Sequence, residues 1–322
     1  MTLISILLAL AAEQWLSADW RGSLRRTFMR LADRIERHFN AGEYRHGVLG
    51  HVLAVAPPVL ASLGVYTLLL WVHPLLALLW NAVVLYFTMG FRQFSHRLTE
   101  IQIALANGDL PAARHELAQW KAGIEEAPAA AEIDADEVVR QSCEHGLQLA
   151  HKHVFGVLFW FVLLPGPIGP ILFRLAEFLA RRWNRPPGGA LPADRFGEFA
   201  RRAFAWIDWL PARLTALGFA IVGDFEGAIY CWRKVTRPPT IAAGLPQPDS
   251  RTVILAAAGG ALGSRVLSSA ESARYFDEAG LEGGGLAEPG AGMLSAAVGL
   301  VWRALLLWLV LLLLITLAGW LT

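Results

Sequence analysis

The residues that could do chemistry in this sequence are a few charged side chains set among apolar ones. Asp208 and Arg213 flank Pro211 within an apolar stretch, and ionisable groups in such stretches are usually paired, face a cavity or serve function. Arginines bind carboxylates and phosphates through paired hydrogen bonds, so they are candidate anion anchors. We expect any ligand-binding site to lie at a cytoplasmic mouth formed by Glu144, His145, Arg174, Glu177, Asp208 and Arg213.

A structural role is the alternative for these charges. Asp208 and Arg213 would then form an ion pair, and Glu177 would pair with Arg181 four positions further along a helix. His151 and His153 lie two positions apart and so face different sides of a helix, which argues against a metal site there. The sequence assigns no catalytic residue and no metal ligand.

Familiar nucleotide-binding and hydrolase motifs are absent from the sequence, which holds no GxxxxGK[ST], GxSxG, HExxH or CxxC pattern. The Gly-rich tract 256–263 could place backbone amides near a phosphate. Small residues also allow helices to pack closely, and on sequence alone we favour packing.

Composition shows what kind of protein must position these side chains. Of the 322 residues, 55% are apolar and 17% are charged, against about 25% charged in a typical soluble domain. Mean hydropathy is +0.43. The net charge of +1 gives no case for nucleic-acid binding. Two cysteines can form at most one disulfide, which excludes a disulfide-stabilised fold in a chain of this length. A membrane protein is therefore indicated.

Charge-free segments predict an all-α, polytopic integral membrane protein with about four or five membrane segments and additional cytoplasmic helices. The chain is expected to form a single membrane domain, with membrane segments at about 2–16, 52–72, 75–91, 153–173, 203–222 and 298–320. A cytoplasmic helical insertion is expected at 92–152 and a flexible loop at 223–297.

Arginine-rich loops set the expected topology, because short basic loops stay cytoplasmic. Residues 17–47 and 174–202 each carry seven arginines, so both are expected inside. The prolines and glycines of 165–170 stop a helix, and a re-entrant hairpin at 153–173 would keep both basic segments on one side. The segment 203–222 would dip in the same way. Two ordinary spans are the alternative.

Several strings resemble the CobD/CbiB family of cobalamin-biosynthesis membrane proteins. These are Phe196-Gly197, the WLPARLTA string at 209–216, Leu158-Phe-Trp160 with its Pro/Gly-rich turn, and the tract AGGALGSRV at 258–266. The N-terminal string 1–14, with IDWLPARL at 207–214 and IVGDFEGA at 221–228, also resembles the related AmpE proteins linked to β-lactamase regulation.

The resemblance to the cobalamin branch implies an ATP-dependent amide ligase of the adenosylcobinamide-phosphate synthase type. It joins an aminopropanol, or its phosphate, to a propionate of adenosylcobyric acid, with ATP and Mg²⁺ as cofactors. Of the family's polar residues, Glu144 is retained. The other aligned positions carry Gln148, Leu149, Lys152, Glu177, Ala180, Phe204, Ala205 and Asp208. Most of the expected carboxylates are therefore missing.

Two functions stay open on the sequence. One is a CobD/CbiB-family protein of cobalamin biosynthesis, with or without ligase activity. The other is a non-catalytic, AmpE-like membrane regulator linked to cell-wall or β-lactamase signalling. In both cases we expect a multi-pass protein of the bacterial inner membrane. Its partners would be the lipid bilayer, a corrinoid or cell-wall-related small molecule and, as an open question, further copies of itself.

Overall fold

The computed structural model describes residues 2–15, 19–122, 132–184, 195–237, 249–276 and 286–321. Within these ranges the structure is helical. The β-type pairing there is one isolated bridge, between Ser264 and Ala287. The predicted all-α fold class is confirmed. The chain divides into two compact units, the first formed by 1–90 and 152–211 and the second by 91–151 and 212–322.

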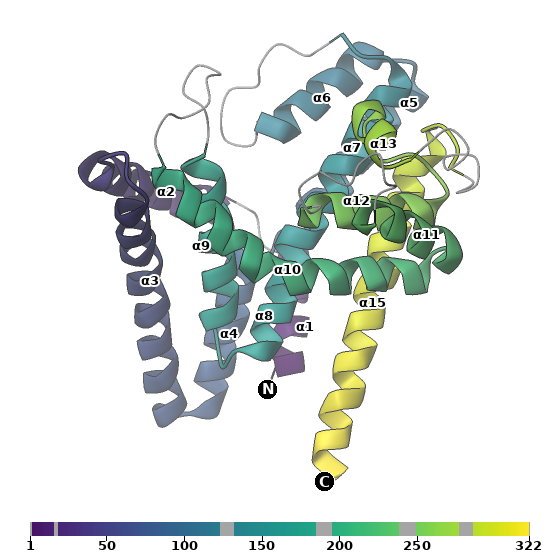
Figure 1. The fold of residues 1–322 in the computed structure, drawn as a ribbon. Helices are drawn as coiled ribbons and strands as arrows, with labels where there is room; N and C mark the ends of the chain where they lie inside the picture. The colour runs from purple at the N-terminus through teal and green to yellow at the C-terminus, as the bar shows by residue number, and fades with distance from the viewer. Residues whose placement is uncertain are drawn as a thin grey trace. The chain divides into compact units, whose positions relative to one another are not determined.

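The first unit is a set of apolar helices around two hairpins. Its helices are α1 (Thr2–Trp15), α2 (Asp19–Phe39), α3 (Tyr44–Val72), α4 (Pro74–Thr88), α8 (Gly156–Leu163), α9 (Ile168–Arg182) and the first part of α10 (Phe196–Val222). α3 and α4 pack side by side (Figure 1) and meet at His73. The side chain of His73 accepts a hydrogen bond from the Leu75 amide at 3.2 Å and so caps α4.

The break predicted at the prolines of 165–170 is present. α8 ends at Leu163 and α9 begins at Ile168, and between them Gly166 adopts a φ of 62°, a region that favours glycine. A Cβ on Gly169 would lie 2.0 Å from the carbonyl oxygen of Trp160, so the two arms touch backbone to backbone. The predicted hairpin shape is therefore found, while its re-entrant position in the membrane stays a prediction.

The core of the first unit lies between α2, α3, α9 and α10. Ala32 and Ile35 of α2 pack with Val55 of α3, Leu179 of α9 and Phe196 of α10. The arginines of α2 with described side chains lie on its opposite, exposed face (Arg26, Arg30, Arg34 and Arg37). α2 is thus an amphipathic helix whose apolar stripe faces the unit's own core.

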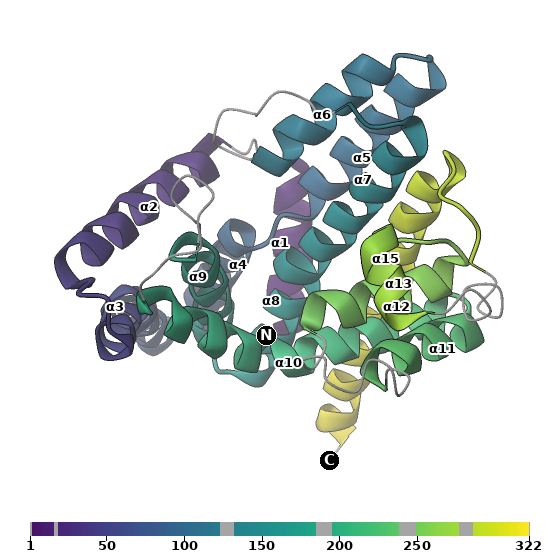
Figure 2. The same ribbon diagram turned by 45° about the horizontal axis from the view of Figure 1, so that its top comes forward.

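The second unit combines a three-helix group with several short helices. Its elements are α5 (Phe91–Ala106), α6 (Leu110–Ala122), α7 (Ala135–Ala150), α11 (Phe225–Thr236), α12 (Ser250–Leu262), α13 (Ser269–Tyr275), α15 (Gly292–Leu321) and the end of α10. α5, α6 and α7 pack against one another, as Figure 2 shows from above. α5 and α6 lie within the cytoplasmic insertion expected at 92–152, which stays a prediction. α7 also belongs to the apolar helix Ala135–Leu163, which is long enough to span a membrane.

The segment 223–297 is expected to be a flexible loop, but its described residues are largely helical. It contains α11, α12, α13 and the start of α15. The Pro and Gly residues that suggested a loop stand between these helices, and Asp224, Asp249 and Ser268 cap their N-termini. The Pro246 and Gly283–Gly285 turns lie outside the described residues.

The Gly-rich tract serves helix packing rather than phosphate binding. Every residue from Thr252 to Ala261 in α12 is buried. A Cβ on Gly260 would lie 2.1 Å from the carbonyl oxygen of Gly227 in α11, so the two backbones are in contact. Gly263 ends α12 in the left-handed conformation with a φ of 64°.

Four helices are long and apolar enough to cross a membrane among the residues described. They are Tyr44–Val72, Ala135–Leu163, Phe196–Val222 and Gly292–Gly319. The second joins α7 to α8 through the π-helical turn His151–Phe155. Leu60, Leu68, Leu306 and Leu314 are among many exposed apolar side chains of these helices, as a lipid-facing surface requires. The protein is therefore a polytopic α-helical membrane protein.

Candidate functional site

Glu144 lies in a chain of ion pairs that links three helices of the second unit. Arg140 of α7 donates to Glu144 at 2.8 Å and to Glu137 at 2.7 and 2.6 Å. Arg251 of α12 donates to Glu144 at 2.5 Å and also pairs with Glu271 of α13. Acids and arginines thus alternate from Glu137 to Glu271, and the network ties α7, α12 and α13 together.

This network engages both carboxylate oxygens of Glu144. Its Oε2 accepts from Arg140, and its Oε1 accepts from Arg251 and, at 3.4 Å, from Gln148. Mg²⁺ prefers carboxylate oxygens that are free to bind it. Among the described residues there is also no group of three or more His, Cys, Asp or Glu side chains able to hold a metal ion. The donor set around Glu144 therefore does not fit a Mg²⁺–ATP site.

The electrostatics of this network lower the pKa of Glu137, chiefly through its hydrogen bond from Arg140, and that of Glu271. Partial burial raises the pKa of Glu271, but hydrogen bonds from Arg251 and Ser268 outweigh it and bring the pKa to about 2. Ser268 and Glu271 also form a capping box at the start of α13. Lys121 of α6 lies near the network, and burial lowers its pKa against the opposing pull of Glu144. It donates a hydrogen bond to Gln141 of α7.

His145, a predicted site residue, and the nearby His151 both pack against neighbouring helices. The ring of His145 meets Trp120 edge to face, with the centroids 4.9 Å apart. His151 is buried, and its Nδ1 lies 2.9 Å from the hydroxyl of Thr215 in α10. Both contacts tie α7 or its π turn to a neighbouring helix, which gives these side chains a structural role.

Glu177 in the first unit has a different environment. It is buried on α9, and three cations surround it: Arg174 at 3.2 Å, Lys152 at 3.8 Å and Arg181 at 3.9 Å. Arg174 and Arg181 lie one turn on either side of Glu177, whereas Lys152 comes from the π turn. One carboxylate thus faces three positive charges, which leaves a positive surplus.

Lys152 and Glu177 are two of the positions where the sequence departs from the CobD/CbiB pattern. By the resemblance drawn from the sequence, Lys152 stands where the family pattern has an Asp, and Glu177 where it has an Asn. In the structure these two side chains form an ion pair. The two departures are thus complementary in charge.

Asp208 and Arg213 both lie on α10. Asp208 is buried and Arg213 is half-buried. Both have interaction partners in the structure, so neither is an isolated charge. Pro211 lies between them within a helix that continues to Val222.

The six predicted site residues divide between the two units. Arg174, Glu177 and Asp208 belong to the first and Glu144, His145 and Arg213 to the second. The structure brings Arg174 to Glu177. Sequence reasoning missed Arg140 and Arg251 as partners of Glu144, Glu271 as the second partner of Arg251, and Lys152 as a partner of Glu177. The local signal for Arg251 in the sequence was its position as a single charged residue at the start of an apolar stretch.

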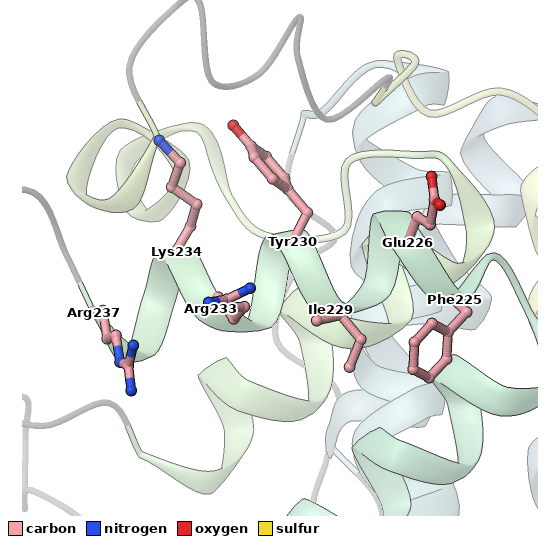
Figure 3. Close-up of a pocket in the computed structure, with 7 residues that line it drawn as sticks. All are labelled: Phe225, Glu226, Ile229, Tyr230, Arg233, Lys234 and Arg237. Carbon is pink, nitrogen blue, oxygen red and sulfur yellow. The ribbon is translucent and has the colours of Figure 1, made fainter.

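A hollow of about 530 Å³ lies on the outer side of α11 (Figure 3). The side chains of Glu226, Tyr230 and Lys234 stand along one side of the helix at successive turns, and the Lys234 ammonium lies 5.6 Å from the Tyr230 ring centre. Arg233 and Arg237 complete a basic helix end, which complements the helix dipole. Because all of its lining residues come from one helix, this hollow is an open surface rather than an enclosed site.

Comparison with known proteins identifies one family. Residues 6–301 match the family described as "CobD/Cbib protein". The "Cobalamin biosynthesis protein CobD" of Stutzerimonas stutzeri (strain A1501) is 33% identical, over 99% of this chain and 98% of that protein. The protein of the same description from Chromobacterium violaceum is 32% identical, over 72% of this chain and 67% of its own length. No solved structure matches the chain.

Proposed function

Because the chain belongs to the CobD/CbiB family, we propose that it acts in cobalamin biosynthesis. The proposed step is the attachment of an aminopropanol, or its phosphate, to a propionate of adenosylcobyric acid. One observation carries this proposal: 33% identity to a cobalamin biosynthesis protein extends over 99% of the chain. Both compact units therefore have counterparts in that relative.

The cation-rich surroundings of Glu177 are the part of the predicted site that we assign to substrate binding. Lys152, Arg174 and Arg181 carry more positive charge than Glu177 neutralises. Arginine forms paired hydrogen bonds with carboxylate and phosphate groups, and a corrinoid acid presents carboxylates. Glu144 is assigned a structural role. Joining a free carboxylate to an amine requires activation of the carboxylate, so the proposed reaction takes ATP as a co-substrate that is cleaved as the amide bond forms. The described residues around Glu144 do not provide a Mg²⁺ site for it.

Complementation tests the proposed step. A cobalamin-producing host lacking its own gene for this step should grow on cobyric acid when it carries the chain. Growth on cobinamide, which already contains the aminopropanol, should need no complementation. A complemented strain that grows on cobinamide and fails on cobyric acid, with the protein present in its membranes, would refute the proposal.

A non-catalytic, AmpE-like regulator is the second candidate. The observation that favours it is that arginines bind both carboxylate oxygens of Glu144, the acid retained in the resemblance to the family pattern. A regulator of this kind should change β-lactamase induction or the response to envelope stress when its gene is deleted. Normal induction together with a cobalamin requirement would eliminate it.

We propose that the protein lies in the bacterial inner membrane, with the turns at His73 outside and Asn107 inside. Single cysteines at these exposed positions can be labelled with a membrane-impermeant maleimide in intact cells. The background is low because Cys143 and Cys231 are buried, and burial together with Asp224 raises the pKa of the Cys231 thiol to about 12. Labelling at position 107 but not at position 73 would overturn this topology.

A further inference from the structure

The exposed face of α2 carries a stripe of positive charge. Exposed arginine side chains follow one another there at intervals of three or four positions, which places them on one side of the helix: Arg26, Arg30, Arg34 and Arg37. This arginine stripe extends about 16 Å along the helix axis. It lies opposite Ala32 and Ile35, which pack into the core of the first unit.

Little acidic charge offsets the arginine stripe. Asp33 is bound by Arg182 of α9 through hydrogen bonds of 2.8 and 3.0 Å, and Glu36 has a partner of its own. The Nε of Arg37 donates to the backbone carbonyl of Asp33 rather than to a carboxylate. The other three arginines form no ion pair with any side chain that the structure describes. The stripe therefore presents positive charge that its own helix does not neutralise.

α2 lies across the first turns of α3, as Figures 1 and 2 both show. A Cβ on Gly50 of α3 would lie 3.4 Å from the Ile35 side chain of α2. On the same turns of α3, Leu49 and Val52 are 54% and 52% exposed, and exposed apolar side chains continue along the helix to Val72. Acyl chains cover such a surface in a membrane protein. α2 therefore lies at the level where the lipid headgroups begin.

Apolar side chains on α2 favour a lipid over a soluble anion. Leu31, which follows Arg30, is 42% exposed, and Phe39 at the end of the helix is 39% exposed. A helix at a membrane surface that exposes both kinds of side chain contacts acyl chains with its apolar residues and phosphates with its basic ones. A soluble anion would contact only the arginines.

We propose that the arginine stripe of α2 binds the phosphate groups of anionic phospholipids, such as phosphatidylglycerol, in the leaflet that surrounds the start of α3. Guanidinium groups form paired hydrogen bonds with phosphate. A zwitterionic lipid brings its own cation, which the stripe repels. The binding surface includes none of the cations around Glu177, so the inference does not depend on the proposed reaction.

Native mass spectrometry of the full chain in a neutral detergent tests the inference. The probes are phosphatidylglycerol and phosphatidylcholine with the same acyl chains, and phosphatidylglycerol should bind at least tenfold more tightly. The double variant Arg30→Gln/Arg34→Gln should weaken phosphatidylglycerol binding at least tenfold, since each arginine near an anionic lipid surface contributes about fivefold. Its binding of phosphatidylcholine should not change. Both substitutions lie opposite the core, so the fold should be retained.

The matched control is Arg233→Gln/Arg274→Gln, which removes the same charge from exposed side chains of α11 and α13. It should alter phosphatidylglycerol affinity less than twofold. A second measurement needs no variant. Phosphatidylglycerol with a photoactivatable group on one acyl chain should cross-link the wild-type chain within α2 or the first turns of α3.

Four outcomes would overturn the inference. They are equal affinity for the two lipids, an equal loss of phosphatidylglycerol binding in the control and the α2 variant, cross-links confined to other segments, and displacement of the lipid by millimolar inorganic phosphate. The last outcome would make the stripe a site for soluble anions.

Discussion

Glu144 and Glu177 are both glutamates within helices of a membrane protein, but their surroundings differ. Glu144 belongs to a network in which three acids alternate with two arginines from α7, α12 and α13. Glu177 is a single acid among three cations, two of which come from its own helix. The first arrangement is nearly neutral, whereas the second keeps a positive surplus.

This difference separates a structural role from a binding role. A network whose charges satisfy one another holds helices together and has little capacity left for a ligand. A surplus of cations around one carboxylate can accept an anion, because the incoming charge completes the pairing. The retained family acid therefore stabilises the second unit, and the altered positions Lys152 and Glu177 are the better candidates for contact with a substrate.

The largest expected effect comes from removing Arg251. Arg251→Ala leaves Glu144 and Glu271 without their shared cation, and the loss of charged hydrogen bonds should lower the free energy of unfolding by about 3 kcal/mol. Thermal unfolding of the detergent-solubilised protein measures it. Arg233→Ala, on the exposed face of α11, is the matched control. Equal melting temperatures for the two variants would show that the network is not structural.

The helix pairs that position the two glutamates can be broken separately. In Gly260→Ala the new Cβ would lie 2.1 Å from a carbonyl oxygen of α11 and would push α12 away from it. In Gly169→Ala the new Cβ would lie 2.0 Å from a carbonyl oxygen of α8 and would push α9 away from it. Each should cost about 1–3 kcal/mol of stability. Gly299→Ala in α15 meets nothing within 4 Å and serves as the control. Gly169→Ala should also impair complementation if Glu177 and its cations bind substrate.

Glu177→Gln tests the surplus of positive charge. Lys152, Arg174 and Arg181 would then lose their shared carboxylate. Because all three are partly exposed, the loss should lower stability by only about 1 kcal/mol, and binding of a simple anion such as sulfate should tighten. In a double-mutant cycle with Lys152→Met, the pair should couple by about 0.5–1 kcal/mol. A coupling near zero, together with unchanged sulfate binding, would contradict the binding role assigned to the surroundings of Glu177.

The smallest effect is a pH dependence confined to the Glu144 network. The pKa of Glu271 is about 2 in the folded chain against an ordinary value of 4.5, so its contribution to stability is complete above pH 4.5. It is lost as the pH falls from 4.5 to 2, because the unfolded chain then binds a proton first. Wild type should therefore lose more stability over this window than Glu271→Gln. If wild type and Glu271→Gln lose the same unfolding free energy between pH 4.5 and 2, this expectation is contradicted.

The membrane helices were predictable because long apolar runs leave few alternatives. α3, α4 and α15 each contain a charge-free stretch of sequence that indicates a helix in a bilayer. The break between α8 and α9 followed from prolines that cannot continue a helix. These signals are local, so one sequence suffices to find them.

The site partners were not predictable, because they come from distant parts of the chain. Glu144 and Arg251 lie 107 positions apart, and no local pattern joins them. The helices within 223–297 were missed for a related reason. α12 has 13 residues, a length that is marginal for an isolated helix, and burial against α11 stabilises it.

The burial of α12 has a consequence for how the chain is made. At 13 residues this apolar helix is about 20 Å long, too short to cross the roughly 30 Å hydrocarbon core of a bilayer. A segment of this kind needs a protein partner as soon as it emerges from the ribosome. α7 and α11, which both pack against it, are synthesised first. Because α7 and α11 precede α12 in the chain, both helices are available to pack against α12 when it is synthesised.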